Sequence, residues 1–412
     1  KLVIDPNPIL QIKFYPEGGG DPTEANQYIL AAQPDGEKLI MATPELPNGN
    51  YFIRTSYSTG GGESNPRLFT VREQVMRTEP LHIDFAADSV AKVRSEIMAA
   101  HKQWGGANGG VSSENVVWNR RTGLMECRGY GDQYTGPVLG VDRVGKPSGI
   151  NTRIGGCLVT RDYYGPSSYR VLARTAQRLG VCTALWTFHY EESYPGSSLW
   201  TSHVEDGLHY GGTEENGYYT VRNHEIDIEM PSALKLDPLG GENVSFENAK
   251  FNTWRGELRN WNAPNNDGYK YDRFGNLDPN WSADNDPSYW SEYEDSFINH
   301  GVNVGDGNFH EFRFDWHVGP DARVEFYIDG TLKHTNTGYI PDIPGRFWAG
   351  LWFPSANLQW AGRGAPWVQE TMLIQTIDII PFADEAEHVR SFTETYPDDV
   401  YRDIKNYILH EG

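Results

Sequence analysis

The segment from Val221 to Ser232, VRNHEIDIEMPS, alternates between two kinds of side chain with a strict period of two. This is the period of a β-strand, in which successive side chains point to opposite faces of a sheet. One face is predicted to be apolar apart from a histidine and to meet a core, and the other is polar and carries three acids. The two sets are His224, Ile226, Ile228 and Met230 on the first face and Asn223, Glu225, Asp227 and Glu229 on the second.

Three carboxyl groups along one strand face lower the stability of a sheet, because like charges a few ångströms apart repel one another. A solvent-exposed acidic face and a metal site are the two structural explanations of such a row. Calcium prefers oxygen ligands, but it usually takes them from a loop and not from a straight strand. We therefore interpret the row as a functional site, where clustered acids with altered pKa values are common.

Short runs of Val, Ile, Phe and Tyr, separated by turns, make up most of the remaining chain. Of 412 residues, 44 are Gly, 25 are Pro and 13% are aromatic, which predicts a mainly β protein. This length suffices for one large domain and an accessory one. Residues 1–77 suggest a small immunoglobulin-like or fibronectin-like β-sandwich module that acts as a spacer or cap. Its strands are expected at residues 9–14, 27–31, 51–57 and 68–71.

Two segments outside the strands show partial helical periodicity. A short helix is expected over residues 88–102. Residues 386–412 are expected to form a C-terminal helical extension, divided by Pro397, that packs on the outside and contributes no chemistry.

Glu225 and Glu229 have the reach to act as a pair. Backbones four residues apart in a strand are about 13 Å apart, but on a bent strand two glutamates can lean together to about 5–5.5 Å. That separation suits retaining hydrolysis of a glycosidic bond, with one ionised nucleophile and one protonated acid. Asp227 lies between them and is expected to orient the nucleophile through a shared proton or hydrogen bond. The pattern alone leaves open which glutamate has which role.

Four further segments surround this strand in a consistent order. With the bulge-free motif Glu225-Ile226-Asp227-Ile228-Glu229, they resemble glycoside hydrolase family 16 over residues 79–385. The resemblance implies an all-β fold, a concanavalin-like β-jelly-roll sandwich with a long cleft across the concave face of one sheet. The segments are GGANGGVSSENVVW (105–118), RIGGCLVTRDYYGPSSYRVLARTAQRLGVCTALWTF (153–188), FHEFRFDWHVGPDARVEFYIDG (309–330) and ETMLIQTIDIIPF (370–382).

The same resemblance assigns a role to each acid: Glu225 is the nucleophile, Asp227 the assisting acid and Glu229 the general acid/base. It implies an endo-acting, retaining glycoside hydrolase that cleaves internal β-linkages of a polysaccharide by double displacement. A transglycosylase of the same mechanism and a non-catalytic carbohydrate-binding jelly roll are the alternatives. The substrate is expected to be a β-glucan or an algal galactan, with or without sulfate.

Several other side chains are predicted to bind substrate. Asn223 shares the parity of the acids and is expected beside Glu225. His310 is expected on a neighbouring strand, with a structural hydrogen-bonding role as its alternative. Arg255 and Arg363 suit sulfate or anhydro-galactose because guanidinium makes bidentate contacts with oxyanions, and ordinary surface positions are their alternative. Sugar-stacking or else core positions are expected for Trp186, Trp200, Trp352 and Trp360, and core positions for Trp316 and Trp348.

The formal net charge of −21 argues against nucleic acid and anionic membranes as partners, because the far field of the chain repels both. No apolar run approaches the roughly 20 residues that span a bilayer. We expect a monomer that is secreted, extracellular, periplasmic or cell-surface, with a polysaccharide as its partner. No cofactor or catalytic metal is expected, although the family allows a structural calcium. Of the three cysteines, Cys157 and Cys182 are predicted to be either buried neighbours or a disulfide.

Overall fold

The chain forms two compact units, Lys1–Val75 and Met76–Gly412. The computed structural model describes residues 10–24, 27–33, 36–42, 46, 49–57, 63–71, 76–101, 110–134, 153–176, 178–193, 220–231, 245–257, 293–353, 365–391 and 401–407. Within these ranges, no helix has the length and apolar character needed to cross a membrane.

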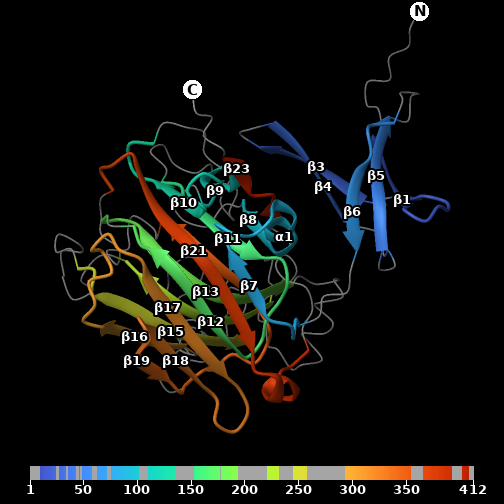
Figure 1. Ribbon diagram of the computed structural model, residues 1–412. Coiled ribbons are helices and arrows are strands. Elements are labelled where there is room, and N and C mark those ends of the chain that lie inside the picture. The colour runs from blue at the N-terminus through green and yellow to red at the C-terminus, as the bar shows by residue number, and fades with distance from the viewer. Residues whose placement is uncertain are drawn as a thin grey trace, which may run out of the picture. The chain divides into compact units, whose positions relative to one another are not determined.

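The first unit is made of antiparallel strands (Figure 1). Four of them form a sheet in the order β2-β1-β5-β6, and the other two form a separate hairpin. All four strands expected in this part of the chain are present, and its immunoglobulin-like or fibronectin-like character stays a prediction. The bounds are β1 (Leu10–Pro16), β2 (Thr23–Glu24), β5 (Gly49–Tyr57) and β6 (Arg67–Val71) for the sheet, and β3 (Gln27–Gln33) and β4 (Gly36–Ala42) for the hairpin.

The second unit contains two large sheets that stack on each other (Figure 1). The nine-stranded sheet consists, in order, of β19 (Thr331–Asn336), β18 (Arg323–Ile328), β17 (His310–His317), β12 (Ser167–Arg174), β21 (Gln369–Pro381), β10 (Leu124–Tyr130), β9 (Val116–Asn119) and β23 (Lys405–Tyr407), with β7 (Leu81–Asp84) also paired to β21. The eight-stranded sheet consists, in order, of β16 (Tyr293–Asn299), β15 (Asn248–Glu257), β14 (Thr220–Met230), β13 (Cys182–Ser193), β20 (Arg346–Trp352), β11 (Gly156–Thr160), β8 (Ile97–Ala100) and β22 (Tyr401–Arg402).

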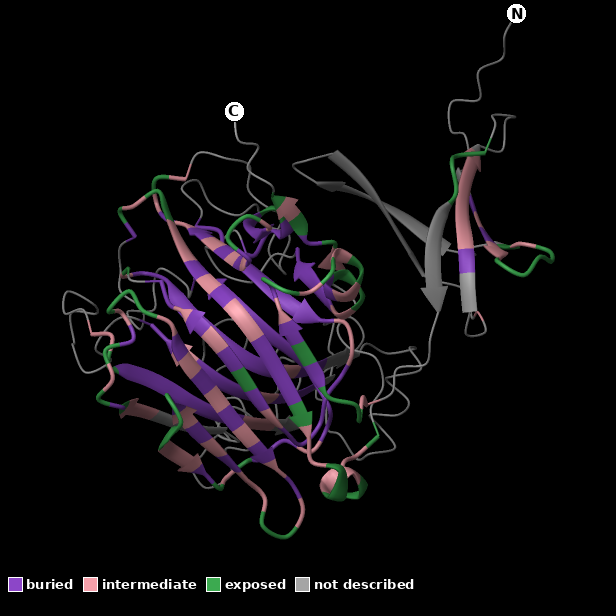
Figure 2. Ribbon diagram, in the orientation of Figure 1, coloured by how far each residue is buried: buried purple, intermediate pink, exposed green. Residues whose placement is uncertain are grey.

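The core of the second unit lies between these sheets. Buried and more exposed residues, most of them intermediate, alternate along strands such as β12 and β17, as the banding in Figure 2 shows. Aromatic rings from the two sheets meet in the middle: Phe251 and Phe326 stack at 4.8 Å between ring centroids, and Tyr169 and Phe347 lie 5.7 Å apart. Trp316 is fully buried in this core, as predicted. The all-β jelly-roll sandwich expected from the sequence is confirmed.

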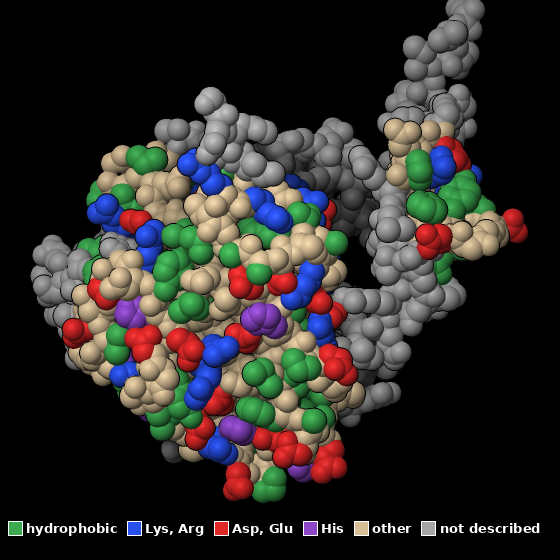
Figure 3. Space-filling model, viewed as in Figure 1, with side chains coloured by type: hydrophobic (Ala, Val, Ile, Leu, Met, Phe, Trp, Pro, Cys, Tyr) green, Lys and Arg blue, Asp and Glu red, His purple; other side chains and the backbone are tan. Residues whose placement is uncertain are grey.

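The outer face of the nine-stranded sheet carries interspersed acidic and basic side chains (Figure 3). Many of them are paired, for example Arg170 with Glu311 at 3.4 Å and Arg323 with Glu325 at 3.0 Å. Exposed pairs of this kind contribute only about 0–1 kcal/mol each. This face therefore has the character of an ordinary solvent-facing surface.

The helical predictions are only partly correct. Helix α1 spans Val90–Glu96, capped by Ser89, and short 3-10 turns cover Ser113–Asn115 and Ala383–His388. The helix expected over 88–102 is wrong beyond Glu96, where the chain continues as strand β8. The side chains of β8 alternate between the two faces of a sheet and are buried on both. The helical extension is wrong over 401–407, where β22 pairs with β8 and β23 pairs with β9.

Candidate active site

Strand β14 lies inside the eight-stranded sheet, between β13 and β15, and presents the three acids on one face, here called the acid face. The opposite face of β14 buries Ile226 and Ile228, which are 0% and 1% exposed, in the core between the sheets. His224 on that face is also buried, and its Nδ1 accepts a hydrogen bond from the backbone N–H of Asp342 at 3.3 Å. The predicted division of β14 into two faces is confirmed.

The three acids differ in exposure. Glu225 and Glu229 are partly exposed, whereas Asp227 between them is only 4% exposed. The outer two carboxyl groups are thus the ones that a bound molecule can reach, and the middle one can act only through its neighbours.

Each acid accepts a hydrogen bond from a different side chain. The Nδ2 group of Asn223 donates to Oε2 of Glu225 at 3.2 Å. On β15, Nδ2 of Asn252 donates to Oε2 of Glu229 at 3.0 Å, and the indole Nε1 of Trp254 donates to Oδ2 of Asp227 at 3.0 Å. These neutral donors orient the carboxyl groups without neutralising them, so the site keeps its negative charge.

Burial raises the pKa of Asp227 well above its ordinary value, and the charges of Glu225 and Glu229 raise it further. A hydrogen bond between Asp227 and Glu225 favours the protonated aspartic acid, while the bond from Trp254 acts in the opposite direction. This direction favours a proton on Asp227 that is directed toward Glu225. Asn223 and Asp227 are thus the two side chains positioned to donate to Glu225.

Aromatic side chains adjoin the acids on the same face. Trp186 lies opposite Asp227 on β13 and stacks on Trp348 of β20, with 5.4 Å between the ring centroids and 17° between the planes. Both are almost fully buried, as predicted for Trp348, while Phe188 and Trp352 next to them remain partly exposed. Asn223, Trp186 and Trp352 are thus the predicted binding residues that the structure brings to the acid face.

His310 lies elsewhere. It belongs to β17 in the nine-stranded sheet, which pairs with β12 and β18 and not with any strand of the acid-bearing sheet. Its two ring nitrogens contact Asp329 at 2.8 Å and Asp306 at 3.1 Å. This arrangement corresponds to the structural role that was the alternative for this histidine. Trp200, Trp360 and Arg363 lie outside the described residues.

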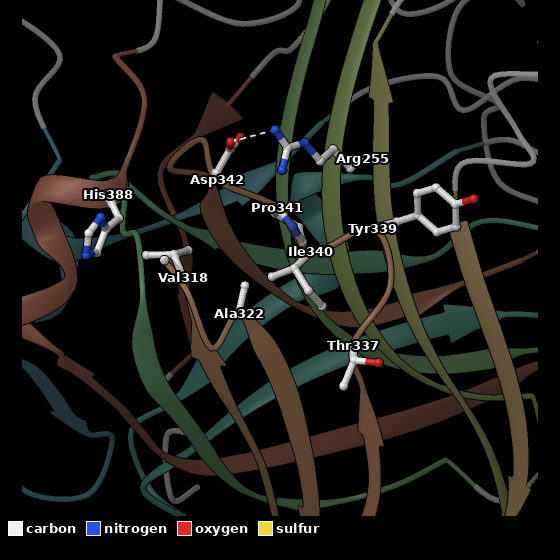
Figure 4. A pocket seen from close by; sticks show the side chains of 10 residues that line it. Arg255, Val318, Ala322, Thr337, Tyr339, Ile340, Pro341, Asp342 and His388 are labelled. Atoms are coloured by element: carbon white, nitrogen blue, oxygen red, sulfur yellow. Dashed lines mark ion pairs between the residues drawn. The ribbon is translucent and has the colours of Figure 1, made fainter.

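Arg255 is on β15 but points to the opposite face from the acids, because it pairs with His224 and not with Glu225. Its guanidinium forms an ion pair of 2.8 Å with Asp342, which also binds Arg390 at 2.7 Å. Figure 4 shows this pair at the wall of a pocket of about 510 Å³, with Tyr339 on the side away from His388.

Asn252 and Trp254 were not singled out from the sequence, although they contact two of the three acids. In the segment NTWRGELRN, Arg255 was predicted to bind substrate. The alternation along this segment could have identified them. In a strand next to β14, Asn252 and Trp254 share one face and Arg255 lies on the other.

The three cysteines are free thiols and all are buried. Cys157 and Cys182 belong to the same cluster on the acid face, so they are buried neighbours and not a disulfide. Burial raises the pKa of Cys182 well above its ordinary value, and the charge of Glu229 raises it further. A thiol in this setting is a packing residue and not a nucleophile.

Comparison with known proteins gives local sequence matches. No family model matches the chain. A β-glucanase of Paenibacillus macerans is 41% identical over 54 residues, which are 13% of this chain and 22% of that enzyme. A β-glucanase of Bacillus licheniformis is 31% identical over 86 residues, which are 19% of this chain and 34% of that enzyme. The chain thus spans about a fifth to a third of the length of these relatives.

Solved structures align over a longer stretch. A B. licheniformis β-glucanase covers 73% of this chain and 97% of its own length, at 19% identity and a TM-score of 0.41. A structure described as a native glycosidic hydrolase covers 74% and 97%, at 18% identity and a TM-score of 0.44. The resemblance to β-glucanases expected from the motif segments is confirmed by the curated matches.

Proposed function

We propose that this chain is a glycoside hydrolase of family 16 that cleaves internal bonds of a β-glucan with retention of configuration. The observation that carries the proposal is the acid face of β14, where two partly exposed glutamates flank a buried aspartic acid. The local identity to β-glucanases supports both the family and the substrate.

The reaction takes two steps. Glu225 attacks the anomeric carbon while Glu229 gives its proton to the leaving glycosidic oxygen, which forms a glycosyl-enzyme ester and releases one end of the chain. Glu229, now ionised, takes a proton from water, and the resulting hydroxide displaces Glu225 from the sugar. The proton on Asp227 and the amide of Asn223 keep Glu225 ionised and oriented, and Asn252 orients Glu229.

The same geometry favours a neutral glucan over a sulfated galactan. Arg255, which had been expected to bind sulfate, is directed to the other face of the sheet. Neither step transfers electrons or needs a Lewis acid, so we propose a cofactor-free reaction in which any bound calcium would be structural. Because a polysaccharide is too large and polar to cross a cell membrane unaided, we propose that the protein is secreted. We also propose that it acts as a monomer.

The test is release of reducing ends from a panel of β-1,3-glucan, β-1,3-1,4-glucan, xyloglucan, agar and carrageenan. Cleavage of a β-glucan in mid-chain, with a β-anomeric product in the first NMR spectra, is the expected result. With an oligosaccharide as substrate, products longer than that oligosaccharide would indicate a transglycosylase instead. Binding without cleavage of any polymer would assign a carbohydrate-binding protein.

Two variants separate the roles of the glutamates. Glu225→Gln is expected to lose activity on every substrate, because no nucleophile remains. Glu229→Gln is expected to lose activity on the polysaccharide but to form the glycosyl-enzyme from an aryl glycoside whose leaving group needs no proton. Unchanged polysaccharide cleavage by either variant would disprove the assignment.

A further inference from the structure

The acid face continues, away from the acids, into a cluster of aromatic and small side chains that we call the aromatic patch. Its partly exposed members are Phe188, Trp352 and Tyr401. Phe188 lies opposite Glu225 on the neighbouring strand, whereas Tyr401 belongs to the C-terminal tail. The buried members are Met98, Ala100, Val111, Cys157, Val159, Cys182, Ala184, Trp186 and Trp348.

Strand β22 brings Tyr401 onto this face. Tyr401 pairs with Ala100 of β8, a member of the patch, whereas the next residue pairs with Ala99, which packs in the core between the sheets. The Tyr401 ring lies 5.9 Å from that of Trp348, although β8 and β11 separate their strands. The rings can meet because the patch residues on the intervening strands near Tyr401, Ala100 and Cys157, are small.

Arg346 holds the tyrosine in place. Its guanidinium carbon lies 4.8 Å from the ring centroid of Tyr401 and 4.8 Å from that of Tyr163. Arg346 is only 9% exposed, and its Nε and Nη1 have no hydrogen-bond partner in the part of the chain that the structure describes. The cation is therefore held between two aromatic faces, which attract it more strongly when water is excluded. Tyr401 is thereby ordered before any ligand binds.

We infer that Tyr401 forms a distal binding position for the polysaccharide, supplied by the C-terminal tail. This inference rests on the proposed function, since it takes a glycan as the molecule that crosses the acid face. From β14 to β22 the sheet has five strand steps of about 4.8 Å, or about 24 Å between the two backbones. The ring of Tyr401 reaches closer to the acids, because it lies 5.9 Å from Trp348, which stacks at 5.4 Å on Trp186 opposite Asp227. The position therefore lies a few sugar units from the cleaved bond. Sugar rings present apolar C–H faces, which pack on partly exposed aromatic rings. The C-terminal tail, which was expected to contribute no chemistry, thus acquires a role in substrate binding.

The tail offers a matched control. Tyr407, in β23, is 38% exposed and pairs with β9 in the other sheet, where Arg128 lies 5.9 Å from its ring centroid. Tyr407→Ala removes a tyrosine from the same tail without touching the acid face. Tyr401→Phe keeps the ring at the proposed position and removes only the hydroxyl.

The experiment measures kcat/KM on β-1,3-1,4-glucan oligosaccharides of increasing length and on the polymer, together with retardation by that polymer in affinity gels. For Tyr401→Ala, the loss is expected to grow with chain length, from little for a trisaccharide to about tenfold for the polymer. Tyr407→Ala is expected to match the unsubstituted protein at every length. Tyr401→Phe is expected to recover most of the polymer activity that Tyr401→Ala loses, because it keeps the ring.

An equal loss at all lengths, or no loss on the polymer, overturns the inference. An equal loss of polymer activity in Tyr407→Ala also overturns the inference, because the tail would then affect activity only by packing against the sheets. Failure of the proposed function has a different signature: the unsubstituted protein cleaves nothing. In that case weaker retardation of Tyr401→Ala supports the binding position, and unchanged retardation disproves it.

Discussion

Replacing Asp227 by Asn tests whether the middle acid of the row is held protonated. An asparagine at this position can donate from Nδ2 toward Glu225 and accept from the indole of Trp254 through Oδ1, so it mimics the protonated acid. It carries no proton that can be lost. The substitution should therefore leave the structure of the acid face unchanged and alter how stability depends on pH.

The sign of the effect follows from the raised pKa of Asp227. Between the ordinary carboxyl pKa and the higher folded-state value, the unfolded chain has released this proton and the native protein has kept it. The free energy of unfolding of the unsubstituted protein therefore falls as pH rises through this window, by about 1.4 kcal/mol per pH unit for one proton. Asp227→Asn lacks this slope, so it should gain relative stability with each pH unit above about 4.

Urea unfolding at a series of pH values from 4 to 7 measures this difference. All 13 tryptophans follow residue 76, so their fluorescence reports on the second unit alone. Asp378→Asn is the contrasting variant, because Asp378 is buried much as Asp227 is, with 6% exposed. Unlike Asp227, it forms ion pairs with Arg170 and His82. Asp378→Asn should therefore lower the free energy of unfolding at pH 7. Parallel pH curves for Asp227→Asn and the unsubstituted protein would refute the reasoning.

Three further substitutions probe the surroundings of the acids. Ile228→Ala should lower the free energy of unfolding by about 2–5 kcal/mol in urea titrations, because it leaves a cavity in a fully buried part of the core. Gly350→Ala should lower the thermal midpoint clearly, because its Cβ would lie 2.3 Å from the carbonyl oxygen of Gly156 on β11. Asn252→Ala removes the donor to Glu229, so the basic limb of the pH–rate profile should move to higher pH.

The faces of β14 could be predicted from the sequence because strand periodicity is a local property. Alternation alone places Ile226 and Ile228 in a core and the acids on the other side, and the structure agrees. The mainly β character followed from the strand-like runs, and the jelly-roll sandwich followed from the resemblance to glycoside hydrolase family 16. Asn223 was also predictable, because it shares the parity of Glu225 on the same strand.

The partners of β14 on other strands were harder to predict, since pairing and register are properties of the whole sheet. His310 has the right residue type but belongs to the other sheet. Arg255 lies on the neighbouring strand, and a shift of one residue in register would have put it among the acids. The short strand with Tyr401 gave no periodic signal, because two residues are too few to show one.

The location of β14 also explains how the sandwich tolerates a row of three acids. Each like-charged pair on a strand face costs roughly 0.2–1 kcal/mol. On the other face, Ile226, Ile228 and Met230 are at most 3% exposed, and burying each contributes about 1.5–3 kcal/mol. The core side therefore outweighs the repulsion on the acid face. A proton on Asp227, which the direction of its pKa shift favours, lowers that repulsion further, because no charge then lies between the two glutamates. In the proposed mechanism the same proton keeps Glu225 ionised, so the stability of the row and the reactivity of the site depend on one group.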